Sequence, residues 1–86
     1  MKHRLGSVTI EAIDTYVRIT IENFNGIGTS PRIGVTKHET PTDIEVVQLL
    51  MQLRESTHWP DKAHLQACSR AAYDARANKE AKELNI

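Results

Sequence analysis

The sequence is poor in cysteine, in net charge and in long apolar runs, and each shortage excludes a class of protein. Cys68 is the only cysteine among 86 residues, so an internal disulfide framework and a thiolate zinc finger are excluded. Eleven basic and eleven acidic side chains cancel, unlike the basic excess of a general nucleic-acid binder. The longest apolar run of the second half, residues 49–51, is far shorter than the ~20 residues of a membrane span. These shortages favour a small cytoplasmic domain without a membrane partner.

Residues 8–21 alternate apolar and polar side chains, as half-buried strands do. A turn at Asp14-Thr15 pairs residues whose numbers sum to 29, and every apolar residue then lies opposite an apolar one. On the other face this register sets Glu11 across from Arg18, a pair worth roughly 0.2–1 kcal/mol. A slip of one residue would break both faces. The pattern therefore predicts this hairpin and its register.

A third strand is expected over residues 32–38, after turn-forming residues at 23–31. Ile33 and Val35 are expected to face the core. Gly34 between them weakens the strand and indicates an edge position or a bulge. The expected sheet is a three-stranded antiparallel meander.

Two helices are expected after the sheet, over residues 41–56 and 60–84. Thr40 is the predicted N-cap of the first helix, and Pro41 suits its first turn. The apolar side chains of this helix cover an arc of roughly 220°, wider than one sheet face covers. The excess must meet the second helix, another copy of the chain or a partner. The predicted inner seam of the second helix consists of Leu65, Cys68, Ala72 and Ala75.

The fold class that follows is α+β, with the order βββαα and both helices packed on one face of the sheet. Residues 1–86 form a single domain in this interpretation. Residues 1–6 are a flexible basic arm, and residues 79–86 are a polar tail that frays past the core. A chain this short has a thin core, so a homodimer is expected, joined through one of the two helices.

Neither a metal site nor a catalytic site is predicted. His64 and Cys68 lie four residues apart on the second helix, but zinc needs three or four ligands. Cys68 is expected to be a small residue of the core, and burial there raises the pKa of a thiol. Residues 26–28 contain two glycines, but a phosphate-binding loop needs a third glycine and a helix directly after it, and the sequence offers neither here. No cofactor is expected, and the protein is expected not to be an enzyme.

Six basic residues are candidates for contact with nucleic acid: Arg18, Arg32, Arg70, Arg76, Lys79 and Lys82. With the basic arm they support one hypothesis, a small DNA-binding transcriptional regulator that uses the arm and the second helix. Acidic residues interleave with the basic ones on that helix, however, which is typical of a solvated face. Nucleic acid is therefore the less favoured partner.

Five apolar residues are candidates for contact with a protein partner: Trp59, Phe24, Ile27, Leu49 and Leu53. Trp59 lies beside a proline in the connection between the helices, and tryptophan is enriched at interface hot spots. The alternative is that Trp59 caps the core and Phe24 folds over the end of the sheet. The leading hypothesis is a non-catalytic module that occupies the surface of another macromolecule. In size and lack of chemistry it is similar in type to phage- or mobile-element-encoded inhibitors of host defence, such as anti-CRISPR and anti-restriction proteins.

Overall fold

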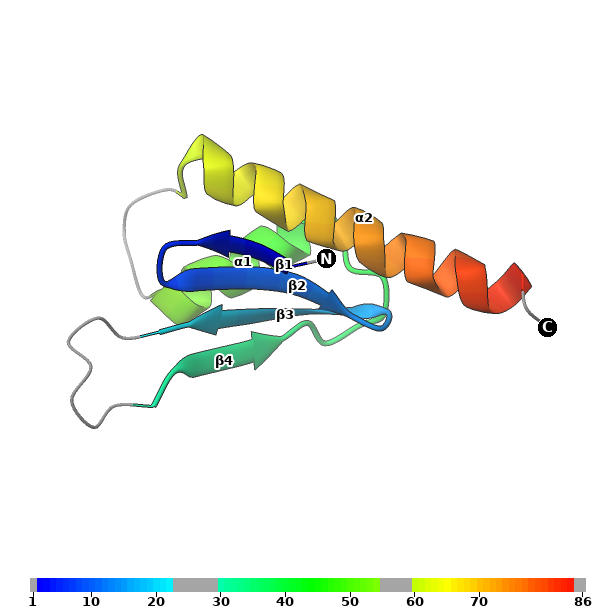
Figure 1. The fold of residues 1–86 in the computed structure, drawn as a ribbon, viewed down its shortest axis with the longest axis horizontal. Helices are drawn as coiled ribbons and strands as arrows, with labels where there is room; N and C mark the ends of the chain where they lie inside the picture. The colour runs from blue at the N-terminus through cyan, green and yellow to red at the C-terminus, as the bar shows by residue number, and fades with distance from the viewer. Residues whose placement is uncertain (1, 23–29, 55–59, 85–86) are drawn as a thin grey trace.

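In the computed structural model the chain is described over residues 2–22, 30–54 and 60–84. Four strands are followed by two helices: β1 (Lys2–Leu5), β2 (Val8–Ile13), β3 (Tyr16–Ile21), β4 (Arg32–Val35), α1 (Asp43–Arg54) and α2 (Lys62–Leu84). The strands form one antiparallel sheet in the order β1-β2-β3-β4, with the long helix α2 running across it (Figure 1). The α+β class and the order of strands before helices are confirmed, and the sheet has one strand more than predicted.

The β2–β3 hairpin has the predicted register. Val8 pairs with Ile21, Glu11 with Arg18 and Ala12 with Val17, so every pair sums to 29. Asp14 turns the chain with a φ of 58°, a conformation that aspartate tolerates better than most residues and that tight hairpins require.

The extra strand is β1, which replaces the expected flexible arm. Lys2–Leu5 pair with β2 in an antiparallel register that sets His3 opposite Ile10 and Leu5 opposite Val8. Leu5 packs against the buried core from this strand. A four-residue strand carries too short an alternation to be read from sequence, but the unpaired edge of β2 offers it a full set of backbone partners.

The predicted orientation of β4 is wrong, because Ile33 and Val35 face away from the helices and are 58% and 50% exposed. The β3–β4 register instead places Gly34 beside Ile19 on the helix-covered face. A Cβ atom at Gly34 would lie 2.9 Å from Cδ1 of Leu53 in α1. The glycine therefore faces inward because α1 already fills the space that a side chain would need.

Helix α1 begins two residues later than predicted, with Thr42 rather than Thr40 as its N-cap. The hydroxyl of Thr42 accepts a hydrogen bond from the backbone N–H of Glu45 at 3.2 Å. The Glu45 carboxylate accepts one in return from the backbone N–H of Thr42 at 3.3 Å, which completes a capping box. The backbone N–H of Thr40 donates instead to the carbonyl of Thr15 at 2.7 Å, and this bond ties the connection to the hairpin turn.

Helix α2 lies on the sheet through small side chains. Its buried residues are Ala67, Cys68, Ala71, Ala72 and Ala75, which lets the helix backbone approach the strands closely. Leu65 was predicted to lie on this seam, but its side chain is 41% exposed, on the flank that faces α1.

The far end of α2 extends past the strands and remains helical to Leu84 (Figure 1). Asn78 donates a hydrogen bond to the backbone carbonyl of Asp14 at 2.7 Å. Lys82 forms an ion pair with the Asp14 carboxylate at 2.6 Å. These contacts tie the helix to the hairpin turn, and fraying of residues 79–86 stays a prediction.

Candidate functional site

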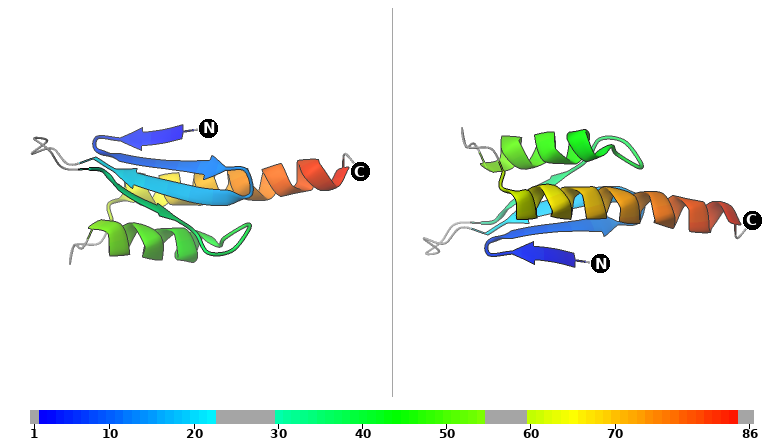
Figure 2. Two further views of the ribbon diagram at one scale, coloured as in Figure 1. Left: turned by 90° about the horizontal axis from the view of Figure 1, so that it is seen from below. Right: turned by 90° about the horizontal axis from the view of Figure 1, so that it is seen from above.

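One face of the sheet is left uncovered by the described helices. Figure 2 shows the sheet in front of α2 from below and α2 in front of the sheet from above. Buried Ile10, Val17 and Ile19 lie on the side of the helices. We call the opposite side the open sheet face. By strand register it comprises Lys2, Arg4, Thr9, Glu11, Ile13, Tyr16, Arg18, Thr20, Ile33 and Val35.

The open sheet face carries exposed aliphatic side chains from β2 and β4, with the half-buried Tyr16 of β3 between them. Ile13 is 41% exposed, less than Ile33 or Val35. Ile13 pairs with Tyr16, and Tyr16 lies diagonal to Val35 across the β3–β4 pair, within reach of side-chain contact. Ile33 lies two residues before Val35 and points to the same side of β4. The four side chains therefore form one apolar line across the sheet, of the kind that marks interaction surfaces.

The charges of the open sheet face are mostly positive. Lys2, Arg4 and Arg18 lie on it with one carboxylate, Glu11. That carboxylate is only 5% exposed and accepts hydrogen bonds from Arg18, including one from Nε at 3.1 Å. Because Glu11 and Arg18 neutralise each other, Lys2 and Arg4 give the face its net positive charge, although the whole chain is formally neutral.

The wide apolar arc of α1 divides into three parts. Val46 and Leu50 are buried in the core. Leu49 and Leu53 pack partly buried against that core, and their contact with a partner stays a prediction. Ile44, Val47 and Met51 form the third part and line a groove of about 650 Å³ together with Asp43, Gln48 and Leu65, and Val47 also packs partly buried against the core. We call this the α1–α2 groove. The other three predicted contacts, Trp59, Phe24 and Ile27, lie outside the described residues.

The structure does not gather the six candidate basic residues on one surface. Arg18 is paired with Glu11, and Lys82 with Asp14. Arg32 donates a hydrogen bond to the backbone carbonyl of Leu53 at 2.9 Å. The other three lie on α2: Arg70 at its β1 side, Arg76 in a hollow beside Tyr73, and Lys79 one turn further on.

His64 and Cys68 do not form a joint site. His64 contacts the carboxylate of Asp61, which also accepts a hydrogen bond from the His64 backbone N–H at 3.2 Å and so caps α2. The side-chain bond and then the backbone bond hold the pKa of Asp61 below its ordinary value. Within the described ranges, no cluster of three histidine, cysteine or carboxylate side chains could hold a metal ion.

Cys68 is fully buried, and burial followed by the nearby charge of Asp43 raises the pKa of its thiol to about 11. We expect the native protein at pH 8 to resist a disulfide-exchange reagent such as dithionitrobenzoate, and the denatured chain to react at once. Because the unfolded thiol ionises first, stability should also fall as pH rises from about 9 to 11. This fall should be absent in Cys68→Ala. Rapid labelling of the native protein would contradict the burial.

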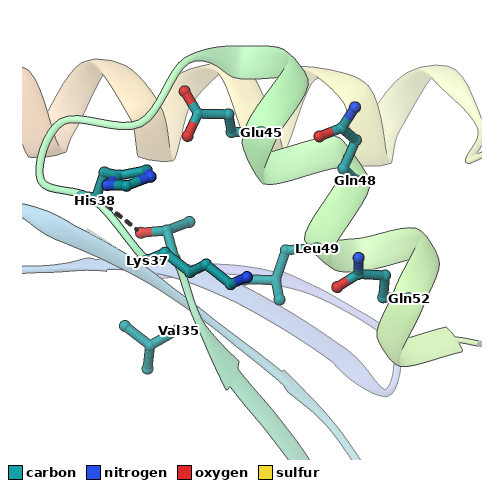
Figure 3. Close-up of a pocket in the computed structure, with 8 residues that line it drawn as sticks. Val35, Lys37, His38, Glu45, Gln48, Leu49 and Gln52 are labelled. Atoms are coloured by element: carbon teal, nitrogen blue, oxygen red, sulfur yellow. Dashed lines mark hydrogen bonds between the residues drawn. The ribbon is translucent and has the colours of Figure 1, made fainter.

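A small polar hollow lies between the end of β4 and α1, with a volume of about 230 Å³. Figure 3 shows His38 and Lys37 on one side of it, and Glu45, Gln48 and Gln52 of α1 on the other. Glu45 is already committed to the capping box, where it also accepts a hydrogen bond from the Thr42 hydroxyl at 3.1 Å. The hollow therefore lacks a carboxylate free to act as an acid or a base.

Together these features define an α+β protein with an open sheet face on one side and an apolar helix groove on the other. No protein-family model, no curated protein and no solved structure matches this chain. Neither helix of the described segments is both long and apolar enough to cross a bilayer. The open sheet face and the α1–α2 groove are therefore the candidate functional surfaces.

Proposed function

We propose that this protein is a non-catalytic module that binds another protein through its open sheet face. The observation that carries the proposal is the line of Ile13, Tyr16, Val35 and Ile33 on a sheet whose other face is the core. Tyr16 is half-buried and the three aliphatic side chains are exposed. Folding normally buries such side chains, and a partner surface would remove them from water at about 25 cal/mol per Å².

Charge complementarity indicates the kind of partner. Lys2 and Arg4 lie on β1 at one edge of the open sheet face, whereas the charge of Arg18 is neutralised by its ion pair with Glu11. A partner surface with an apolar middle and carboxylates at its rim matches this arrangement. Rim charges of this kind mainly raise the association rate and select the partner. Occupation of such a surface is the mode of action of an inhibitor, in keeping with the phage-type comparison drawn from the sequence.

Three side chains that could have served in catalysis are unsuited to it in the described structure. The thiol of Cys68 is buried and protonated at neutral pH, His64 is engaged by Asp61, and Glu45 caps its own helix. None of these groups combines access to a cavity with a partner that would activate it.

The test uses one substitution on each surface. We expect Ile33→Glu to weaken partner binding more than tenfold, the scale of a hot-spot residue, and Ile44→Glu in the groove to leave it unchanged. The immobilised chain is first incubated with nuclease-treated lysate of its native cell, and the affinity of the retained protein is then measured for each variant. If the retained protein binds the Ile33→Glu variant normally but no longer binds the Ile44→Glu variant, the open sheet face is not the binding surface.

One observation supports the second candidate, a nucleic-acid-binding regulator. A hollow of about 320 Å³ between β1 and α2 is lined by residues of both elements, Arg70 among them, so the N-terminal segment lies beside the second helix, as that hypothesis requires. Binding of a labelled duplex that falls steeply between 50 and 200 mM salt would favour this candidate. The exposed aliphatic side chains of the apolar line, Ile13, Ile33 and Val35, gain nothing from phosphate contact, so the protein partner is the better match.

A further inference from the structure

The α1–α2 groove is a second apolar surface, on the opposite side of the molecule from the open sheet face. Ile44 is 69% exposed at one end of it, and Leu65 of α2 forms one wall. Ile44, Val47 and Met51 are spaced by three and then four residues, so at 100° per residue they fall within about 60° of one another. This is the spacing of a seam that packs against another helix.

The charges beside the groove are self-complementary. Helix α1 carries Asp43 in its first turn and Arg54 in its last. Eleven residues separate them, which leaves them about 20° apart around the helix axis, on the same flank of the seam. Side chains on the same flank meet when two copies of a helix pack antiparallel. Antiparallel packing therefore brings each Asp43 toward the other copy's Arg54, whereas parallel packing leaves these two charges at opposite ends of the helix pair.

We propose that a second copy of this chain occupies the α1–α2 groove, with the two α1 helices antiparallel about a two-fold axis near Val47 and Gln48. This axis sets Ile44 of each copy against Met51 of the other. The Asp43–Arg54 attraction then occurs twice, as an isologous contact requires. The two open sheet faces lie on the outside of the dimer, so this inference goes beyond the proposed function and does not depend on it.

Existing contacts of the charged residues are compatible with this pairing. One oxygen of Asp43 accepts a hydrogen bond from the Ser69 hydroxyl at 2.9 Å, which fixes the carboxylate at the groove and leaves its other oxygen for a cation. The charge of Arg54 contributes the smallest of the influences that lower the pKa of Asp61. Arg54 is exposed, so its side chain is accessible to a second copy.

Sedimentation equilibrium of the full chain tests the dimer. We expect the wild type to dimerise in the micromolar range and Ile44→Glu to weaken the dimer at least 100-fold. Glutamate suits a first helical turn, so this variant should keep its fold. The matched control, Ile33→Glu on the open sheet face, should leave the dimer unchanged. A chain that stays monomeric up to about 1 mM, the weak limit of specific association, would overturn the proposal and leave the groove to a different molecule.

Charge exchange tests the antiparallel orientation separately. Asp43→Lys and Arg54→Glu should each weaken the dimer about tenfold, because each replaces two attractions by two repulsions. The double variant should return to within about threefold of the wild type, with circular dichroism confirming that all variants are folded. A double variant weaker than either single one would refute the antiparallel pairing. Neither outcome alters the expected effect of Ile33→Glu on partner binding, so the two proposals can fail independently.

Discussion

Replacing Leu50 by alanine is expected to lower the free energy of unfolding by about 2–5 kcal/mol, the cost of deleting three buried carbons and leaving a cavity. Leu50 is fully buried, and Val46 is the only other α1 residue in the buried core. A domain of this length has a total stability of roughly 4–13 kcal/mol. The variant should therefore lose a large part of its stability, measured by urea denaturation followed by circular dichroism.

The matched control is Leu65→Ala, the same chemical change at a side chain that is 41% exposed. Its expected cost is below about 1 kcal/mol, since surface substitutions rarely cost more. Both variants are measured at low protein concentration, so that association through the α1–α2 groove does not contribute. Equal losses at the two positions would contradict the structure, because the sequence pattern alone places Leu65 on the inner seam of the second helix.

The β2–β3 hairpin shows why part of the fold could be predicted. Its register follows from residues that lie within fourteen positions of one another, and a shift by one residue would expose every apolar side chain. Burial on one face and ion pairing of Glu11 with Arg18 on the other indicate the same alignment. Two independent local signals thus select a single register.

The orientation of β4 shows where local signals fail. Ile33 and Val35 are the apolar residues of that strand, so a rule that buries apolar side chains turns Gly34 outward. The structure does the reverse, because Leu49 and Leu53 of α1 need the space beside Gly34. That requirement comes from a helix that follows in the chain, and no feature of β4 itself contains it.

The two candidate surfaces could likewise be predicted only in part from local sequence signals. The excess of the α1 arc was visible in the sequence, and the spacing of Ile44, Val47 and Met51 was its signal. Which part of the arc stays exposed depends on where β4 and α2 contact the helix. An uncovered sheet face followed from the prediction that both helices pack on one side, but its apolar side chains on β4 did not, because they depend on the outward turn of that strand.

Gly34→Val is expected to lower the free energy of unfolding by about 1–3 kcal/mol, the usual cost of overpacking. Strand propensity alone predicts the opposite sign, because valine is favoured in strands and glycine is depleted there. In the structure a Cβ at this position would lie 2.9 Å from Cδ1 of Leu53 and 3.0 Å from Cδ1 of Leu49. A branched side chain would have to displace both leucines, so α1 would move from the sheet.

A compensating truncation identifies the clash as the cause. Leu53→Ala removes two of the three atoms nearest to the added Cβ, so Gly34→Val should cost less in this background by about 0.5–3 kcal/mol, the range for residues in contact. Leu65→Ala removes the same atoms from a distant site, and its effect should simply add to that of Gly34→Val. Urea denaturation of the three single and two double variants measures both couplings. Strict additivity with Leu53→Ala, or a stabilising Gly34→Val, would show that α1 does not approach the sheet at Gly34 and that β4 turns its apolar residues inward.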